Sequence, residues 1–255
     1  MILLLDVGNT HTHVGWGTRK GLRVLGDIPT PAWRTEEGSR RLETLLDGRN
    51  PGQLCFCSVV PEVNRHLVEW ARSRFDLKPL QLTPLTVRGV GIDYPRPETI
   101  GQDRLANAVA ARHHHGAPSL VVDFGTAVTF DVVDAGGNYV GGIIAPGLSA
   151  MTDYLHEKTA LLPRIRIRNA RRVIGRNTEE AMLSGAVFGY RGLVRGLILE
   201  LRRELGVRRL PVVATGGYAR LIARGLPEIH TVTPGLTLEG LRLTALAHCD
   251  RPIPS

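Results

Sequence analysis

The sequence predicts an α/β protein built from two similar lobes. Two observations carry this prediction. Apolar runs rich in β-branched residues alternate with segments of helical spacing along the whole chain. In addition, one strand-and-turn pattern occurs twice, and position 6 of the first copy corresponds to position 123 of the second. An alternation of this kind is typical of sheets covered by helices, and the repeat indicates that the architecture is duplicated.

The individual elements follow from local pattern. Strands are expected where short apolar runs end at turn-forming residues, at 2–7, 54–60, 120–124, 127–133 and 210–215. Helices are expected where apolar side chains recur every three to four positions, at 63–75, 103–114, 179–205 and 218–223. Glycine and proline concentrate at 48–52 and 163–175, which we expect to be loops within the fold.

The composition excludes several classes of protein. Of the 255 residues, 43% are hydrophobic and 22% are charged, which is far from the composition of disordered chains. The longest apolar runs are much shorter than the ~20 residues of a membrane-spanning helix, so we expect no membrane segment. Asp6 interrupts the apolar start of the chain, which does not resemble a secretory leader. We therefore expect a cytoplasmic protein whose three cysteines are reduced.

The net charge of +8 comes from 32 Lys and Arg residues against 24 Asp and Glu residues. A positive field of this kind attracts small anionic substrates. Arginines are dense at residues 164–172, but no aromatic side chains interleave them, as a nucleic-acid-binding surface would require for base stacking. We therefore expect no nucleic-acid partner.

The internal repeat is a duplicated hairpin. Residues 3–10 read Leu-Leu-Leu-Asp-Val-Gly-Asn-Thr, and residues 120–127 read Leu-Val-Val-Asp-Phe-Gly-Thr-Ala. In both copies a strand delivers an aspartate, a glycine follows two positions later, and a second apolar strand departs. The repeat predicts an N-terminal lobe at residues 1–112 and a C-terminal lobe at residues 113–255.

The repeated aspartate turn is suited to binding phosphate and a cation. Main-chain N–H groups beside a glycine can approach phosphoryl oxygens, while the strand-end carboxylate holds the accompanying metal. A single hairpin of this type is more often an ordinary turn whose Asp and Asn side chains satisfy local backbone groups. Two copies in matching contexts favour the ligand site.

Three motifs occur in the order that is typical of one enzyme family. They are Asp6-Val7-Gly8-Asn9-Thr10, Gly101-Gln102-Asp103-Arg104-Leu105-Ala106-Asn107-Ala108 and Asp123-Phe124-Gly125-Thr126-Ala127. Shorter matches occur at residues 58–61, 141–147, 177–178, 215–217 and 236–241. The chain therefore resembles the type III pantothenate kinases over nearly its whole length. This resemblance implies two related actin-like ATPase lobes, also called ribonuclease H-like, with mixed sheets flanked by helices and with ATP between them.

The resemblance also implies a reaction and its cofactors. It would be the ATP-dependent phosphorylation of pantothenate to 4'-phosphopantothenate, the first step of coenzyme A biosynthesis. Asp103 would be the general base that accepts the proton of the substrate hydroxyl. Asp6 would lie near Mg²⁺, and Asp123 would hold a monovalent cation, K⁺ or NH₄⁺. A homodimer is also implied.

The resemblance assigns further residues to the two ligands. The ATP-binding residues would be Asp6, Val7, Gly8, Asn9, Thr10, His11, Thr12, His13 and Thr126. The pantothenate-binding residues would be Tyr94, Gly101, Gln102, Asp103, Arg104 and Thr178. Read from the residues alone, Asp103 could merely complement the dipole of the helix that it begins. Tyr94 could be only a packed loop aromatic, and Thr178 also lies at a predicted helix start that Asn177 caps.

Two other functions are consistent with part of this pattern. One is a regulatory protein in transcription, although such a protein could lose its carboxylates and this chain keeps Asp6, Asp103 and Asp123. The other is a kinase of the same superfamily that acts on a different small alcohol. Only the matches at Gly101 to Arg104 and at Thr178 favour pantothenate over another alcohol.

Overall fold

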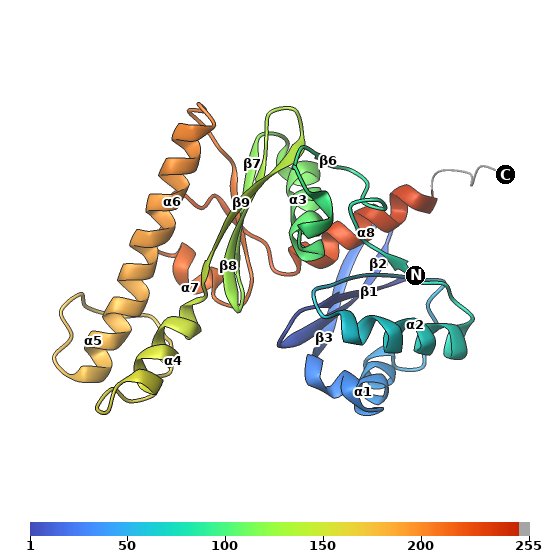
Figure 1. Ribbon diagram of the computed structural model, residues 1–255, viewed down its shortest axis with the longest axis horizontal. Coiled ribbons are helices and arrows are strands. Elements are labelled where there is room, and N and C mark those ends of the chain that lie inside the picture. Colours follow the sequence, from blue (N-terminus) through green and yellow to red (C-terminus); the bar gives the residue numbers. More distant parts are fainter. Residues whose placement is uncertain (250–255) are drawn as a thin grey trace. The chain divides into compact units, whose positions relative to one another are not determined.

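The computed structural model describes residues 1–249, and the chain forms two compact units (Figure 1). Unit 1 consists of Met1–Ala117, Gly136–Val140 and, within the described residues, 235–249. Unit 2 consists of Pro118–Ala135 and Gly141–Pro234. The final helix thus packs with the N-terminal residues. The boundary between the two duplicated lobes, expected near residue 113, stays a prediction.

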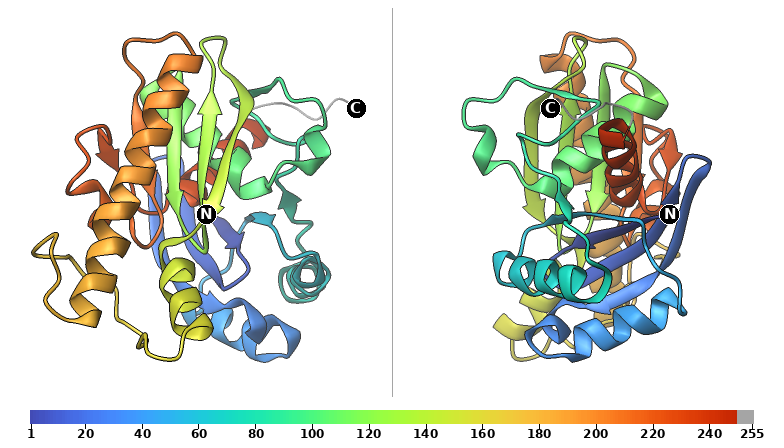
Figure 2. Two further views of the ribbon diagram at one scale, coloured as in Figure 1. Left: turned by 60° about the vertical axis from the view of Figure 1, so that its left-hand side comes forward. Right: turned by 90° about the vertical axis from the view of Figure 1, so that its right-hand side faces the viewer.

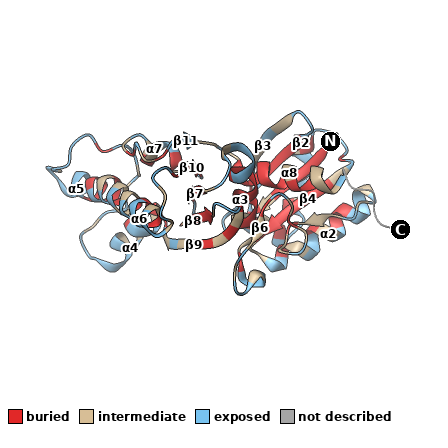
Figure 3. Cartoon of the chain, turned by 90° about the horizontal axis from the view of Figure 1, so that it is seen from above, coloured by how far each residue is buried: buried red, intermediate tan, exposed pale blue. Residues whose placement is uncertain are grey.

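Unit 1 is built on a mixed sheet with the strand order β3-β2-β1-β4-β5. Strands β1 (Ile2–Val7), β2 (His11–Thr18) and β3 (Gly21–Pro29) form an antiparallel meander. Strand β4 (Gln53–Ser58) runs parallel to β1, and β5 (Leu80–Gln81) runs parallel to β4. The apolar run of β1 is fully buried, as expected for a central strand with both faces covered (Figure 3).

Helices cover both faces of this sheet (Figures 1 and 2). Helices α1 (Glu37–Leu46) and α2 (Pro61–Phe75) share an apolar cluster with Leu3, Leu5 and Val7 of β1. Side chains alternate between the faces along a strand, so Leu4 and Asp6 lie on the opposite face. That face is covered by two helices that come later in the chain, at residues 102–115 and 236–249.

Helices α3 (Gln102–His115) and α8 (Leu236–Cys249) pack against each other on the Asp6 face. A Cβ atom at Gly240 of α8 would collide with the main chain of Ala106 in α3, so the glycine lets the two helices approach closely. Glu239 of α8 accepts hydrogen bonds from Arg242 at 2.7 Å and pairs with Nε2 of His114 in α3 at 2.8 Å. These contacts fix the position of α3.

The connections of unit 1 contain short elements. The 3-10 helices are η1 (Thr30–Arg34), after β3, and η2 (Pro97–Thr99), before α3. The short strand β6 (Gly91–Ile92) runs parallel to residues 138–139. These residues open strand β9 (Asn138–Pro146), which continues into unit 2.

Unit 2 repeats the sheet topology of unit 1. Five strands of the second sheet have the order β11-β10-β7-β8-β9, and the short strand β6 pairs with the start of β9. Strands β7 (Ser119–Phe124) and β8 (Ala127–Val133) form an antiparallel hairpin, and β10 (Val212–Thr215) and β11 (Thr231–Val232) continue in parallel on the other side of β7. Strands β7 and β10 therefore correspond to β1 and β4. The duplicated hairpin expected from the sequence is confirmed.

The helices of unit 2 are α4 (Leu148–Lys158), α5 (Thr178–Ser184), α6 (Tyr190–Glu204) and α7 (Ala219–Ala223). A π-helical turn at Gly185–Gly189 joins α5 to α6 into one helix of 27 residues. By length and hydropathy alone this helix could cross a membrane, but core helices meet the same criterion. Its two central arginines bond within the unit, because Arg191 donates to the carbonyl of Leu221 and Arg195 pairs with Glu228. We therefore interpret it as a helix that packs within unit 2.

The predicted fold class, α/β with mixed sheets flanked by helices, is confirmed. All nine predicted elements form, but some boundaries move. The strand expected at 54–60 ends at Ser58, because Pro61 begins α2, and the strand expected at 210–215 begins at Val212. The predicted cap of α5 is also present, since Asn177 Oδ1 accepts the N–H of Glu180 at 2.9 Å. Strand β2 was implied by the repeated hairpin without bounds, and five longer elements were not predicted: β3, β9, α1, α4 and α8.

Candidate functional site

Asp6 lies at the carboxyl end of β1, on the sheet face that α3 and α8 cover. Its register partner on the neighbouring parallel strand is Cys57 of β4. The buried Cys57 thiol donates a hydrogen bond to Oδ1 of Asp6, with Sγ and Oδ1 3.3 Å apart. The carboxylate itself is half-buried. A strand-end carboxylate with this partial exposure can reach a bound ligand.

Asp103 lies in the first turn of α3. Its Oδ1 accepts the main-chain N–H of Arg104 at 2.8 Å. A Cβ atom at Gly101, the residue before the helix, would lie only 2.6 Å from the same Oδ1, so a glycine is needed for this carboxylate position. Burial raises the pKa of Asp103 more than the hydrogen bond and positive charge of Arg104 lower it.

The two carboxylates of unit 1 lie near the same thiol. Burial raises the pKa of Cys57 well above its ordinary value, and the negative charges of Asp6 and Asp103 raise it further. Asp6 and Asp103, which are 97 positions apart in the chain, therefore belong to one acidic site. Its thiol stays neutral and serves as a hydrogen-bond donor.

Gln102 fixes the start of α3 against the sheet. Its Oε1 accepts the main-chain N–H of Ser58, at the end of β4, at 3.0 Å, and the side-chain amide of Gln81 at 3.2 Å. These bonds hold the residue before Asp103 to the strand that carries Cys57. Gln102, which the sequence predicts to contact the substrate, thus also bonds to residues of two strands, β4 and β5.

The tip of the β1–β2 turn is exposed at Asn9, Thr10 and His11. The turn is closed by a hydrogen bond from the N–H of Gly8 to the carbonyl of His11 at 3.0 Å. Val7 and Thr12, also predicted to bind ATP, have buried side chains, so only their main chains are available for such a contact. His13 is half-exposed and pairs with Asp27 of β3 at 2.7 Å.

Tyr94 and Arg104 lie around the ring of Tyr139, which is 1% exposed. The centroids of the Tyr94 and Tyr139 rings are 6.1 Å apart, and Cζ of Arg104 lies 5.7 Å from the centroid of the Tyr139 ring. Two of the predicted substrate residues thus share one aromatic neighbour in unit 1. Sequence analysis missed Tyr139, because it is a lone aromatic in a strand that the pattern did not predict.

The remaining predicted residues belong to unit 2. Asp123 lies one residue before the end of β7, is half-buried and has Thr215 of β10 as its register partner. Thr126 is exposed in the β7–β8 turn, and Thr178 is exposed at the start of α5. A Cβ atom at Gly216, whose φ is +89°, would lie 2.6 Å from Oδ1 of Asp123. The Asp123 carboxylate therefore packs directly against glycine backbone.

The donor set fits a magnesium ion that arrives with a nucleotide. Within residues 1–249, no group of three or more His, Cys, Asp or Glu side chains is arranged to hold a metal. Mg²⁺ is usually bound by one or two carboxylates together with substrate phosphates and water, and a dense protein cage is not required. The half-buried Asp6 carboxylate is suited to that role.

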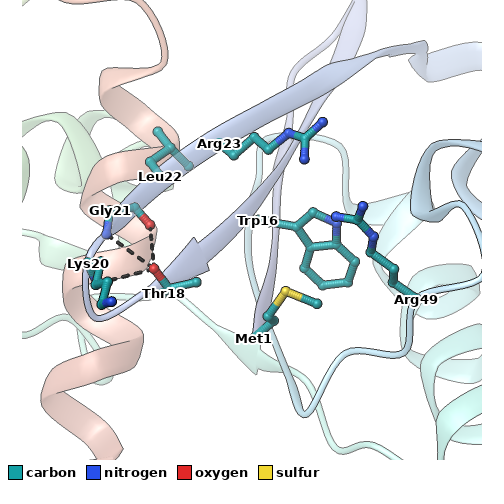
Figure 4. A pocket seen from close by; sticks show the side chains of 8 residues that line it. All are labelled: Met1, Trp16, Thr18, Lys20, Gly21, Leu22, Arg23 and Arg49. Carbon is teal, nitrogen blue, oxygen red and sulfur yellow. Dashed lines mark hydrogen bonds between the residues drawn. The ribbon is translucent and has the colours of Figure 1, made fainter.

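Two pockets in unit 1 differ in their relation to this site. One, of about 380 Å³, opens beside the start of β1, at the opposite end of the strand from Asp6 (Figure 4). Its lining consists of Met1, Trp16, Thr18, Lys20, Gly21, Leu22, Arg23 and Arg49, none of which the sequence analysis assigned to a ligand. A smaller pocket, of about 240 Å³, borders the β1–β2 turn at Asn9 and is also lined by Thr30 and Trp33.

Comparison with known proteins gives a consistent result. Residues 2–200 match the family model for type III pantothenate kinase. A type III pantothenate kinase from Akkermansia muciniphila is 49% identical over 247 residues, covering 95% of this chain and 97% of the relative. One from Methylacidiphilum infernorum is 44% identical over 245 residues, covering 95% and 87%.

A solved structure of the ethanolamine utilization protein EutJ from Carboxydothermus hydrogenoformans has a TM-score of 0.50 at 16% identity and covers 95% of this chain and 89% of its own. At that identity the likeness shows the fold alone, which is the actin-like ATPase fold. The family model and the relatives show more: the chain belongs to the type III pantothenate kinase family and is a pantothenate kinase, the enzyme of the first step of coenzyme A biosynthesis.

Proposed function

We propose that Asp103 is the general base of this kinase and that Asp6 binds the magnesium of Mg-ATP beside it. The observation that carries the proposal is geometric. The Cys57 thiol donates to Asp6 at 3.3 Å, and Gln102, the residue before Asp103, accepts the N–H of Ser58, the residue after Cys57, at 3.0 Å. A phosphoryl transfer needs an alcohol oriented by a base and a nucleotide whose phosphate charge is offset by a metal. Unit 1 supplies one carboxylate for each of these roles.

The proposed reaction is an ordinary phosphoryl transfer from ATP to an alcohol. The hydroxyl oxygen of pantothenate forms a bond to the γ-phosphorus of ATP, the bond to the bridging oxygen breaks, and ADP leaves. The hydroxyl proton moves to the carboxylate of Asp103. Because this transition state is largely dissociative, the carboxylate first orients the hydroxyl and accepts the proton late. Burial raises the pKa of Asp103, which makes the carboxylate a better proton acceptor than an exposed one.

Pantothenate is an anion, and we propose that unit 1 provides most of its contacts. Tyr94 and Arg104, which share Tyr139 as a neighbour, would form one wall, with Arg104 giving a charge-assisted hydrogen bond to the substrate. Gly101 and Gln102 would contribute at the start of α3. Thr178, exposed at the start of α5 in unit 2, is the remaining proposed contact.

We propose that the turn from Asp6 to His13 binds the phosphates of ATP, with Gly8, Asn9, Thr10 and His11 at its accessible part. In unit 2, Thr126 would contact ATP, and Asp123 would hold K⁺ or NH₄⁺. Hard oxygen ligands such as a carboxylate suit these cations. When bound, Mg²⁺ and the monovalent cation would supply positive charge that offsets the charge on the phosphoryl oxygens.

A homodimer in the cytoplasm is the assembly that we propose. Unit 2 exposes apolar side chains on and near α4, with Tyr154 61% and Leu161 89% exposed. Apolar surface of this kind often marks an interface, and a second copy of the chain would cover it. Light scattering of the purified protein should give twice the 27.9 kDa chain mass. A monomer at micromolar concentration would contradict this part of the proposal.

The catalytic assignment is tested by steady-state kinetics with Mg-ATP, pantothenate and K⁺. We expect pantothenate-dependent ADP release that needs the monovalent cation. The value of kcat/KM for pantothenate should fall toward acid pH as Asp103 becomes protonated, with a midpoint above the ordinary aspartate value of about 3.9, because burial raises the pKa of Asp103. An acid limb at or below that ordinary value would contradict Asp103 as the base.

A further inference from the structure

Thr30, the first residue of η1, binds both ends of the β1–β2 turn. Its main-chain N–H donates to the carbonyl of Thr10 at 3.0 Å. Its hydroxyl donates to the carbonyl of Gly8 at 2.7 Å. The exposed Asn9 lies between these two carbonyl groups in the chain. One residue, distant in the sequence, therefore fixes the turn tip from both sides.

The hydroxyl of Thr30 ends a directed chain of hydrogen bonds. Trp33 Nε1 can only donate, and it donates to Oγ1 of Thr12 at 3.0 Å. The hydroxyls of Thr12 and Thr30 are 3.2 Å apart. The single hydroxyl proton of Thr30 is used on Gly8, so the Thr12 hydroxyl must donate to Thr30. The order is thus Trp33 to Thr12, Thr12 to Thr30, and Thr30 to the carbonyl of Gly8.

All three side chains of this chain are buried. Thr12 is 0% exposed, Thr30 3% and Trp33 2%. Water does not compete for hydrogen bonds at such positions, and linked hydrogen bonds polarise one another in a low-dielectric interior. The chain also extends from the apolar cluster that contains Trp33. The turn tip is therefore anchored to the core of unit 1 and does not depend only on its own hairpin.

Fixing the carbonyl of Gly8 also fixes the next amide. The peptide bond is planar and trans, so the N–H of Asn9 points opposite to the carbonyl of Gly8. That carbonyl points at the Thr30 hydroxyl. The N–H of Asn9 therefore points away from Thr30. An amide held in this way is preorganised to donate to an anion.

We infer that Thr30 is a positioning residue for ATP: it holds the Asn9 amide in place through the carbonyl of Gly8, without touching the nucleotide itself. This inference rests on the proposed role of the turn in binding phosphates. Nothing in the sequence marks Thr30, which follows Pro29 outside every motif of the family resemblance.

The test is Thr30→Val, which keeps the side-chain volume and the main-chain bond to Thr10 but removes the hydroxyl. We expect the KM for Mg-ATP to rise about tenfold, because a loosened turn must be ordered on binding. The KM for pantothenate should change less than twofold. Thr30→Ser, which restores a hydroxyl, should return the KM for Mg-ATP to within twofold of the parent value.

Thr152→Val is the matched control. Thr152 is 4% exposed, and its hydroxyl donates to a main-chain carbonyl, that of Ser149, at 2.9 Å. The Thr152→Val variant should lower the melting temperature much as Thr30→Val does, but it should leave the KM for Mg-ATP unchanged. If Thr30→Val lowers the melting temperature but leaves that KM unchanged, the inference is wrong and Thr30 is merely structural.

Asp6→Asn separates this inference from the proposed function. If Asp6→Asn weakens Mg-ATP binding and Thr30→Val does not, only the positioning role of Thr30 is overturned. If neither variant changes Mg-ATP binding, the phosphate site itself has been misplaced and both proposals fail.

Discussion

The hairpin that carries Asp6 in unit 1 and the hairpin that carries Asp123 in unit 2 share their strand topology, but different contacts fix them. In unit 1, side chains hold the turn, through the hydroxyl of Thr30 and the hydrogen bonds behind it. In unit 2, close backbone packing does, because added Cβ atoms at Gly147 and Gly216 would collide with Thr126 and with the Asp123–Phe124 region.

The residues beside the two aspartates also differ. Asp6 is paired in register with Cys57, a neutral buried thiol that donates to it, whereas Asp123 is paired with Thr215. Unit 1 adds a second carboxylate, Asp103, near the same thiol. The two hairpins thus share a scaffold, while the immediate surroundings of their carboxylates differ.

The largest effect on stability should come from the contacts that fix α3 behind Asp103. Burial alone would raise the pKa of Glu239, but hydrogen bonds from Arg242 and His114 outweigh burial and lower it. Glu239→Gln leaves the buried Arg242 without its counter-charge and should lower the free energy of unfolding by about 3–5 kcal/mol. Chemical denaturation measures this loss. Glu37→Gln, at an exposed pair with Arg41, should leave the free energy of unfolding nearly unchanged.

Unit 2 should be sensitive to a single methyl group. Gly216→Ala places a Cβ atom 2.6 Å from Oδ1 of Asp123 at a φ of +89°, so strain and overpacking together should cost about 2–4 kcal/mol. Gly217→Ala is the matched control, because its Cβ atom would meet nothing within 4 Å. Equal melting temperatures for the two variants would refute the idea that close backbone packing holds the turn of unit 2.

The buried carboxylate of Asp103 should destabilise the folded protein at neutral pH. The folded-state pKa of Asp103 is raised, so its ionisation opposes folding at neutral pH, and that cost disappears below the unfolded-state pKa of about 3.9. Asp103→Asn should therefore be more stable than the parent protein at pH 7, with a gain that shrinks as the pH falls. A variant that is less stable at pH 7 would contradict this. Urea denaturation at several pH values makes the measurement.

The smallest expected effect concerns two threonines of α8 in unit 1. The buried hydroxyl of Thr244 has no hydrogen-bond partner among the described residues. Thr244→Val should raise the free energy of unfolding by about 1 kcal/mol, because an unsatisfied polar group is removed. Thr237→Val should lower it by a similar amount, since its hydroxyl donates to Asn107 at 3.0 Å. Changes of the same sign would show that buried hydroxyls do not govern this helix.

Much of the fold could be predicted because its signals are local. The strand-end aspartates and their glycines repeat in the sequence, and the continuous apolar run of β1 predicts a strand that is buried on both faces. Strand β3 was missed because its exposed positions break the apolar pattern. Helix α8 was missed because polar residues such as Glu239 and Arg242 are buried in it, so no polar face marks the helix in the sequence.

The surroundings of the site could not be predicted in the same way. Cys57, Tyr139 and Thr30 act through contacts that only the tertiary structure creates, and none of them lies in the three aspartate motifs. A glycine that avoids a collision, such as Gly216, leaves a trace in the sequence as part of a short motif. A threonine that donates to a distant carbonyl leaves none.

The most direct test of Asp103 as the proton acceptor is the turnover of Asp103→Asn at saturating Mg-ATP and pantothenate, with nucleotide binding measured on the same sample. Loss of a general base should lower kcat by about 10²–10⁴-fold, while the dissociation constant for Mg-ATP stays within twofold of the parent value. A kcat within threefold of the parent enzyme would contradict the assignment, and the proton would have to pass to another group.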